Sequence, residues 1–172
     1  MVLLNPLEYL LLAELMHRPA SGYDLRKRLQ NGAFSDSPGS VYPAVKRLAD
    51  RGLIEAGRAA GRRRRTAFRA TEAGRRALLD WARAAVDVAD LRRDARAVEL
   101  RYAVLGEHGT PAELRAFLVQ YADAVAAHLG AAQAEYEALP RSNLAKRQMA
   151  RLAIDVLLAR HTWAVRSFKE LS

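Results

Sequence analysis

Two helical patterns of apolar residues occupy the first 32 positions of the chain. Leucines are dense through residues 6–17, which predicts a helix buried on most sides, and Pro19 ends it. Ser21 can cap a second helix over residues 22–32, in which Gly32 provides the stop. The chain therefore begins with two helices joined by a very short connection. The side chains of the second helix that we expect to face the core are Tyr23, Leu25 and Leu29.

A third helix is predicted to begin near Ser40, because Pro43 has no backbone N–H and fits only in a first helical turn. At 100° per residue its apolar side chains share one face, which consists of Val41, Ala44, Val45 and Leu48. The opposite face consists of Tyr42, Pro43, Lys46, Arg47 and Asp50. Such a helix can present the free N–H groups of its first turn to a phosphate and its polar side chains to base edges.

The segment after the third helix is typical of a β-hairpin that carries arginine. Gly52 ends the helix, residues 53–58 and 63–70 are predicted as two strands, and a glycine-containing turn joins them. Thr71 is a suitable cap for a fourth helix that extends to Val88. Three helices, a hairpin and a further helix form the winged helix-turn-helix layout. In that layout one helix enters the major groove and the hairpin contacts the flanking backbone or the minor groove. The cations at the turn of this hairpin and at the start of its second strand are Arg62, Arg63, Arg64 and Arg65.

The second half of the chain is predicted to be helical throughout. An apolar stripe runs through residues 91–105 in steps of three and four, and Thr110 begins a capping box for a helix to about Leu139. That helix is about 45 Å long at 1.5 Å per residue. The last helix has one apolar side made of Met149, Leu152, Val156, Ala159 and Trp163, and a second made of Leu157, Ala164, Phe168 and Leu171.

These patterns predict two domains, residues 1–86 and residues 87–172. Helices as long as those of the second domain cannot bury their stripes against one small domain, so we expect them to complete their core with a partner chain in a coiled-coil-like dimer. The predicted fold class is mainly α, with a two-stranded wing on a winged helix-turn-helix and an all-helical C-terminal dimerisation domain.

Charge narrows the choice of partner. The net charge is +9, and residues 1–90 hold 16 Lys and Arg against 10 Asp and Glu. Residues 58–76 alone hold eight arginines and one acid, Glu72. This local excess favours a polyanionic partner, either nucleic acid or a membrane surface. The apolar N-terminal segment is interrupted by Glu8 and Glu14 and is too short to span a bilayer, so we interpret it as a core helix and not as a signal or anchor. The leading hypothesis is a DNA-binding protein with no membrane partner.

Nothing in the sequence favours catalysis. The chain has no cysteine, which excludes disulfides and thiolate zinc sites and fits a reducing cytoplasm. The four histidines lack metal-site spacing, and no phosphate-cradling loop or nucleophile elbow is present. We therefore expect no enzyme activity, no cofactor and no metal.

The stretches "SGYDLRKRL", "GSVYPAVKRLADRGLIE", "GRRRRTAFRATEAG" and "RRALLDW" resemble the DNA-binding half of PadR-like transcriptional regulators, over roughly residues 5–86. Phe68 and Ala70 depart from the tyrosine and leucine that are usual at these two positions. The resemblance implies a homodimeric repressor on an inverted-repeat operator. It assigns DNA contacts to Ser40, Tyr42, Pro43, Lys46 and Arg47 of the third helix and to Arg62, Arg63, Arg64 and Arg65 of the wing.

The resemblance also implies control by an effector. In PadR-like proteins, aromatic residues near the dimer interface can line a small-molecule pocket. Tyr121, His128 and Trp163 are the candidates here, for a small aromatic or amphipathic effector between the C-terminal helices and the winged domain. The alternative for these residues is that they close the dimer core. The alternative for the whole protein is a winged-helix module that docks an acidic protein or a membrane surface without sequence-specific DNA recognition.

Overall fold

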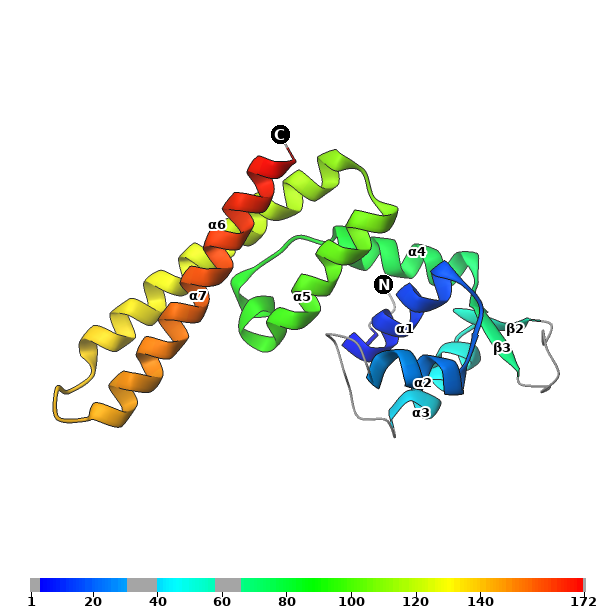
Figure 1. Ribbon diagram of the computed structural model, residues 1–172, viewed down its shortest axis with the longest axis horizontal. Coiled ribbons are helices and arrows are strands. Elements are labelled where there is room, and N and C mark those ends of the chain that lie inside the picture. The colour runs from blue at the N-terminus through cyan, green and yellow to red at the C-terminus, as the bar shows by residue number, and fades with distance from the viewer. Residues whose placement is uncertain (1–3, 31–39, 58–65, 172) are drawn as a thin grey trace. The chain divides into compact units, whose positions relative to one another are not determined.

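The computed structural model describes residues 4–30, 40–57 and 66–171, and the chain forms two compact units, Met1–Ala82 and Arg83–Ser172. The mainly helical fold class with a small antiparallel sheet is confirmed (Figure 1). In chain order the elements are α1 (Pro6–His17), β1 (Ala20–Ser21), α2 (Gly22–Gln30), α3 (Val41–Asp50), β2 (Ile54–Gly57), β3 (Ala67–Ala70), α4 (Glu72–Arg83), α5 (Val88–His108), α6 (Pro111–Ala138) and α7 (Leu144–Glu170).

Helix α1 forms the centre of the first unit. It begins at a capping box, in which Asn5 Oδ1 accepts the N–H of Glu8 at 2.9 Å and Glu8 Oε2 accepts the N–H of Asn5 at 3.0 Å. Leu11 and Leu12 are fully buried, as a helix dense in leucine predicts. The helix ends at His17, because the residue that follows precedes a proline and is held in extended backbone.

Helix α2 is amphipathic, but only two of the three side chains predicted to face the core do so. Leu25 and Leu29 are buried, but Tyr23 is 42% exposed, so its prediction as an inward residue is wrong. Two residues correspond to 200° of helix rotation, which places Tyr23 on the side opposite Leu25.

Helix α3 has the predicted faces. Val41, Ala44, Val45 and Leu48 are all buried, and the side chains on the opposite face are exposed. The helix ends in a Schellman motif, in which the N–H of Leu53 bonds the carbonyl of Leu48 and the N–H of Gly52 bonds that of Ala49. Gly52 has a φ of 67°, a conformation that glycine adopts without strain.

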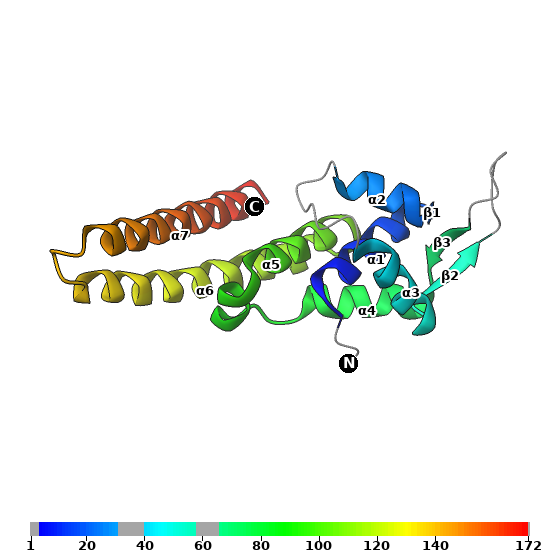
Figure 2. The same ribbon diagram turned by 90° about the horizontal axis from the view of Figure 1, so that it is seen from below.

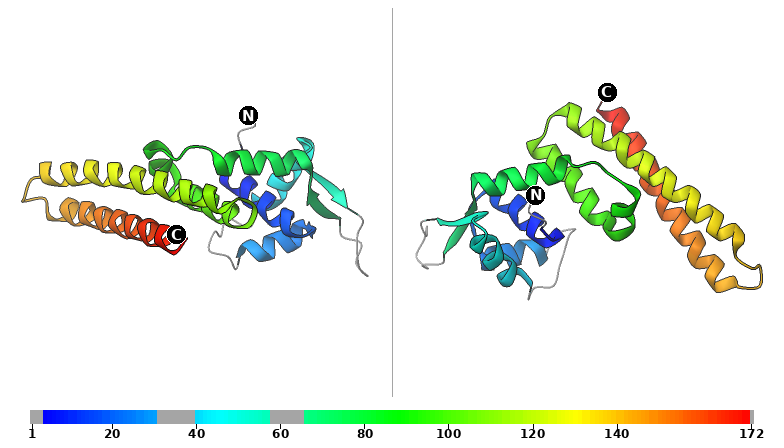
Figure 3. Two further views of the ribbon diagram at one scale, coloured as in Figure 1. Left: turned by 90° about the horizontal axis from the view of Figure 1, so that it is seen from above. Right: turned by 180° about the vertical axis from the view of Figure 1, so that it is seen from behind.

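The sheet contains one strand more than predicted. Its order is β1-β3-β2, all antiparallel, because the two residues of β1 pair with Phe68 and Ala67 of β3. The predicted pair of strands is present as β2 and β3, and this hairpin projects from α1, α2 and α3 (Figures 2 and 3). Arg62, Arg63, Arg64 and Arg65 lie outside the described residues.

The predicted end of the fourth helix is wrong. The hydroxyl of Thr71 caps α4 as expected by accepting the N–H of Gly74 at 3.1 Å, but α4 stops at Arg83 and not at Val88. Asp87 is extended and its carboxylate accepts the N–H of Asp90 at 2.7 Å, so it caps a new helix. This helix, α5, bends at Asp94, a residue with non-helical backbone angles.

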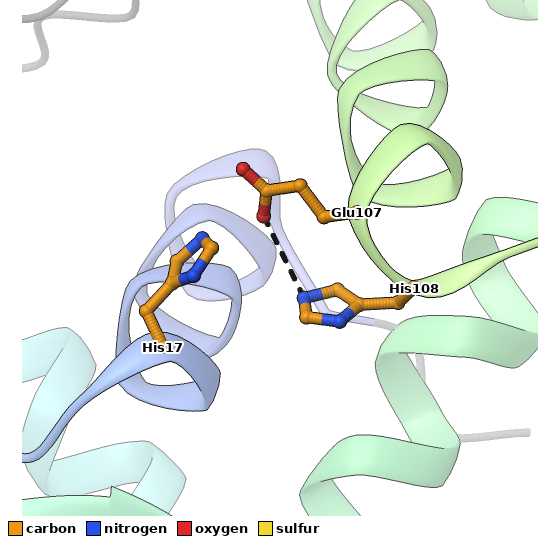
Figure 4. Close-up of side chains that lie close together, drawn as sticks. All are labelled: His17, Glu107 and His108. Atoms are coloured by element: carbon orange, nitrogen blue, oxygen red, sulfur yellow. Dashed lines mark ion pairs between the residues drawn. The ribbon is translucent and has the colours of Figure 1, made fainter.

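Helix α5 ends with an acid and a histidine in sequence. His108 Nε2 lies 3.6 Å from a carboxylate oxygen of Glu107, the pair drawn with a dashed line in Figure 4. A histidine in the last turn is placed favourably toward the negative end of the helix dipole.

Helices α6 and α7 run antiparallel and side by side along most of their length (Figures 1 and 2). The capping box predicted at Thr110 is confirmed: its hydroxyl accepts the N–H of Glu113 at 3.2 Å, and the Glu113 carboxylate accepts the N–H of Thr110 at 2.7 Å. Of the two apolar sides predicted for α7, the second is the buried one, with Leu157 and Ala164 in the core. The first is largely uncovered in the single chain, since Met149 is 65% and Leu152 55% exposed.

Among the described residues, no helix combines the length and the apolar character that crossing a bilayer requires.

Candidate nucleic-acid interface

The outward face of α3 is the candidate surface for reading DNA. Tyr42 is 51% exposed, and Pro43 and Lys46 are exposed beside it, while Ser40 at the N-cap is half-buried. The hydroxyl of Ser40 makes no capping hydrogen bond to the first turn. Lys46 has no ion-pair partner within the described part of the chain, so its ammonium is available to an external anion or base edge.

The ring of Tyr42 is positioned by a glycine. A Cβ atom added to Gly22 would lie 2.9 Å from Cε1 of Tyr42, closer than such atoms approach one another. The ring therefore lies directly against the backbone at the start of α2. This contact limits the freedom of an exposed aromatic side chain on the candidate interface.

Arg47 is engaged within the protein. Its Nε donates to Oε1 of Glu8 at 2.7 Å, and Nη1 of Arg51 lies 3.8 Å from Glu8 Oε2. Glu8 is only 2% exposed. One buried carboxylate on α1 thus caps its own helix and binds two arginines at the C-terminal end of α3. Sequence reasoning treated Glu8 only as an interruption of an apolar segment, although its spacing of three from Asn5 is that of a capping box.

We expect Glu8→Gln to lower the free energy of unfolding by about 2 kcal/mol, because it removes a charge-assisted hydrogen bond from a buried site while a glutamine can still serve the capping box. Urea denaturation measures this. The matched control is Glu55→Gln, which breaks the exposed pair with Arg69 and should cost under about 1 kcal/mol. Equal losses from the two variants would contradict a special role for Glu8.

Among the described residues of the β2–β3 hairpin, the one arginine forms an ion pair within the protein. Arg69 of β3 lies opposite Glu55 of β2 in the sheet register, and Arg69 Nη2 lies 2.8 Å from Glu55 Oε1. Its charge is therefore partly offset in the free protein. The charge available to DNA from the wing depends on the neighbouring arginines that the sequence places between the strands.

The candidate effector residues lie on α6 and α7 in the second unit. Tyr121 is fully buried, and its ring meets that of Trp163 edge-on at a centroid distance of 5.5 Å. The Tyr121 hydroxyl donates to Glu99 Oε1 at 3.1 Å, and Arg160 Nε donates to the same oxygen at 3.0 Å. Burial, and next the charge of Glu99, raise the pKa of Tyr121, so it stays a neutral donor.

His128 lies two helical turns beyond Tyr121 on α6. Its Nδ1 is buried without a hydrogen-bond partner among the described residues. Burial, and next Arg92 and Arg160, lower the pKa of His128, so its neutral form is favoured. The structure therefore brings Tyr121 and Trp163 into contact and leaves one polar atom of His128 unsatisfied.

The family model described as "Transcriptional regulator PadR-like family" matches residues 11–80. The solved structures that are similar to the chain include the following three. PadR of Bacillus subtilis in complex with operator DNA is 18% identical with a TM-score of 0.46, over 98% of this chain and 100% of that one. PadR of Bacillus subtilis in complex with p-coumaric acid is 20% identical with a TM-score of 0.44, over 96% of this chain and 95% of that one. A PadR-like transcriptional regulator from Bacillus cereus is 16% identical with a TM-score of 0.41, over 96% of this chain and 95% of that one. No curated protein matches the sequence.

Proposed function

We propose that this chain, which belongs to the PadR-like family of transcriptional regulators through residues 11–80, is a sequence-specific DNA-binding protein that reads its operator with α3. The observation that carries the proposal is the division of α3 into a buried apolar face and an exposed face that carries Tyr42 and Lys46. A helix of this kind beside a basic hairpin suits entry into the major groove, with the hairpin on the flanking backbone.

The proposed roles of the contact residues differ. Tyr42 and Lys46 reach base edges, whereas Ser40 and Pro43 in the first turn of α3 lie near the sugar-phosphate backbone of the DNA. Arg47, held by Glu8, sets the position of α3 and contacts phosphate with its remaining N–H groups. The wing arginines, Arg62, Arg63, Arg64 and Arg65, supply phosphate contacts without sequence preference.

We further propose a homodimer formed through residues 87–172, with residues 1–86 as the DNA-binding domain. The exposed apolar side of α7 supports this proposal, because a water-exposed row of Met149, Leu152 and Val156 is stabilised when a second copy covers it. Two recognition helices in one dimer would read an inverted repeat whose half-sites lie about one helical turn, or a multiple of it, apart.

The regulatory part of the proposal is a repressor that a small aromatic or amphipathic effector releases from DNA. Two observations support an effector site on α6 and α7: Nδ1 of His128 is buried without a hydrogen-bond partner among the described residues, and the buried Tyr121 contacts the half-buried Trp163. An effector acts only if it binds the state that does not bind DNA more tightly than the state that does.

The test of DNA reading is a gel shift on the DNA upstream of the protein's own gene, with excess nonspecific competitor. Lys46→Gln should weaken binding to that DNA about tenfold and binding to random DNA much less, because a base-edge contact discriminates by about 1–3 kcal/mol. Lys27→Gln, an exposed lysine of α2 outside the α3 face, is the matched control and should change both affinities little. Equal losses on both DNAs after Lys46→Gln would show that α3 positions the protein without reading the sequence.

The same assay tests the alternative function, a module that docks an acidic protein or a lipid surface. If random competitor DNA completely removes the protein from the upstream DNA, the binding is not sequence-specific, and the result favours this module over a specific regulator.

A further inference from the structure

A groove of about 590 Å³ lies in the first unit, lined by residues from the start of α2, from one side of α3 and from β3. Its size is in the range of small-molecule sites, which run from about 300 to 1,000 Å³. The DNA-reading role proposed above does not account for a groove with mainly apolar walls. Its walls and floor include Tyr23, Tyr42, Val45, Ala49 and Phe68.

The walls suit a flat apolar molecule. Three aromatic rings border the groove, and flat rings pack well against one another in offset or edge-to-face contacts. Two of these rings are held in place. Tyr42 lies against the backbone of Gly22, and the guanidinium of Arg26 lies 5.7 Å from the ring centroid of Tyr23. A ligand between them would therefore lose little free energy in ordering the site.

The charge around the groove favours an anion. Lys46 borders it and has no ion-pair partner within the described residues, and none of the described residues that line the groove is acidic. The first half of the chain is also basic as a whole. Lys46 is exposed at the border of the groove, so its ammonium can reach a carboxylate or sulfonate whose ring lies against the apolar walls and form a charge-assisted hydrogen bond with it.

A DNA strand is a less suitable occupant of the groove itself. The sugar-phosphate backbone is highly charged and hydrated, and proteins bind it with several cations and N–H groups. The groove offers one cation and three aromatic side chains among the residues that the structure describes. We propose that it binds a small planar aromatic molecule with a single anionic group, whose ring lies between the aromatic walls and whose anion pairs with Lys46.

Such a ligand covers Tyr42 and Lys46 and would exclude DNA by direct competition. This consequence rests on the proposed function, whereas ligand binding does not. The site is separate from the proposed effector residues Tyr121, His128 and Trp163, which belong to α6 and α7.

The test uses 2-naphthoate and its uncharged counterpart 2-naphthamide, titrated into the full chain by calorimetry without DNA. One 2-naphthoate should bind per chain, about tenfold more tightly than 2-naphthamide, which is the effect of one charge-assisted hydrogen bond. Lys46→Gln should remove this preference for the anion, and Ala49→Phe should remove binding of both compounds by filling the groove. The matched controls, Lys27→Gln and Ala73→Phe at exposed positions outside the groove, should bind as the parent does.

Three results would overturn the site: no binding of 2-naphthoate, equal affinity for the two compounds, or unchanged binding by both Lys46→Gln and Ala49→Phe. In the last case the Trp81→Phe variant, in which Trp163 is the remaining tryptophan, locates the ligand, because its emission changes if the compound binds beside Trp163.

Adding operator DNA separates the two proposals. Direct competition predicts that apparent operator affinity falls in proportion to the fraction of groove filled by 2-naphthoate. If 2-naphthoate binds the groove as expected but DNA and ligand bind together, the ligand site stands and the placement of DNA on Tyr42 and Lys46 is wrong.

Discussion

Replacing both Met149 and Leu152 by glutamate is expected to leave a folded monomer that binds operator DNA at least about a hundredfold more weakly than the proposed dimer. The two side chains lie on the exposed side of α7, 65% and 55% exposed, so the charges meet water in a single chain. In a dimer the same charges would be buried without partners, which is strongly unfavourable. The operator affinity falls because each half-site must then be bound independently.

Sedimentation and gel shift measure the two parts of this expectation, and circular dichroism checks that the variant remains helical. Thr162→Glu is the control, since it adds a negative charge at an exposed position of the same helix away from the apolar row. A double variant that still sediments as a dimer would show that the interface lies elsewhere and would leave the exposed row of α7 unexplained.

Changing Arg62, Arg63, Arg64 and Arg65 together to alanine should weaken binding to every DNA sequence alike, by about 100-fold or more at low salt. The reason is electrostatic: each phosphate contact that is lost lowers the slope of log affinity against log salt by about 0.9, so four contacts change it by roughly 3.6. Affinities measured between about 50 and 200 mM salt, on operator and on random DNA, give both slopes.

The control for the wing is the pair Arg75→Ala and Arg76→Ala, exposed arginines of α4 that reduce the net charge without touching the hairpin. If this pair changes the slope as much as the four wing substitutions do, net charge and not wing contact governs binding. A loss confined to the operator after the wing substitutions would instead mean that these arginines read sequence, for instance through the width of the minor groove.

In the first unit, the boundaries and faces of α1 and α3 are set by residues close to them in the sequence. The boundaries of α1 and α3 follow from a capping box, from Pro43 in a first turn and from Gly52 at positive φ, and these signals lie within a few residues of the boundary that they set. The two faces of α3 follow from the period of 3.6 residues alone. The candidate surface with Tyr42 and Lys46 was therefore predictable from the order of the amino acids.

Local signals are ambiguous at two places. The apolar character of Tyr23 predicts a core position, but its angle on α2 opposes that of Leu25 and the side chain is exposed. Asp87 can continue one helix or cap the next, and in the structure it caps α5, so the predicted end of α4 at Val88 is wrong.

Only the tertiary structure decided the remaining features, because each depends on residues far apart in the chain. Glu8 and Arg47 are 39 positions apart, and nothing local indicates that a buried carboxylate on α1 binds the end of α3. Helix α7 has two apolar sides in sequence, and periodicity cannot choose between them. The choice was made by packing, since Leu157 and Ala164 lie in the core while Met149 and Leu152 remain exposed in a single chain. The sequence by itself thus determined which helix has the exposed polar face proposed to meet DNA, whereas the surface proposed for a second chain depended on which side of α7 the fold had already covered.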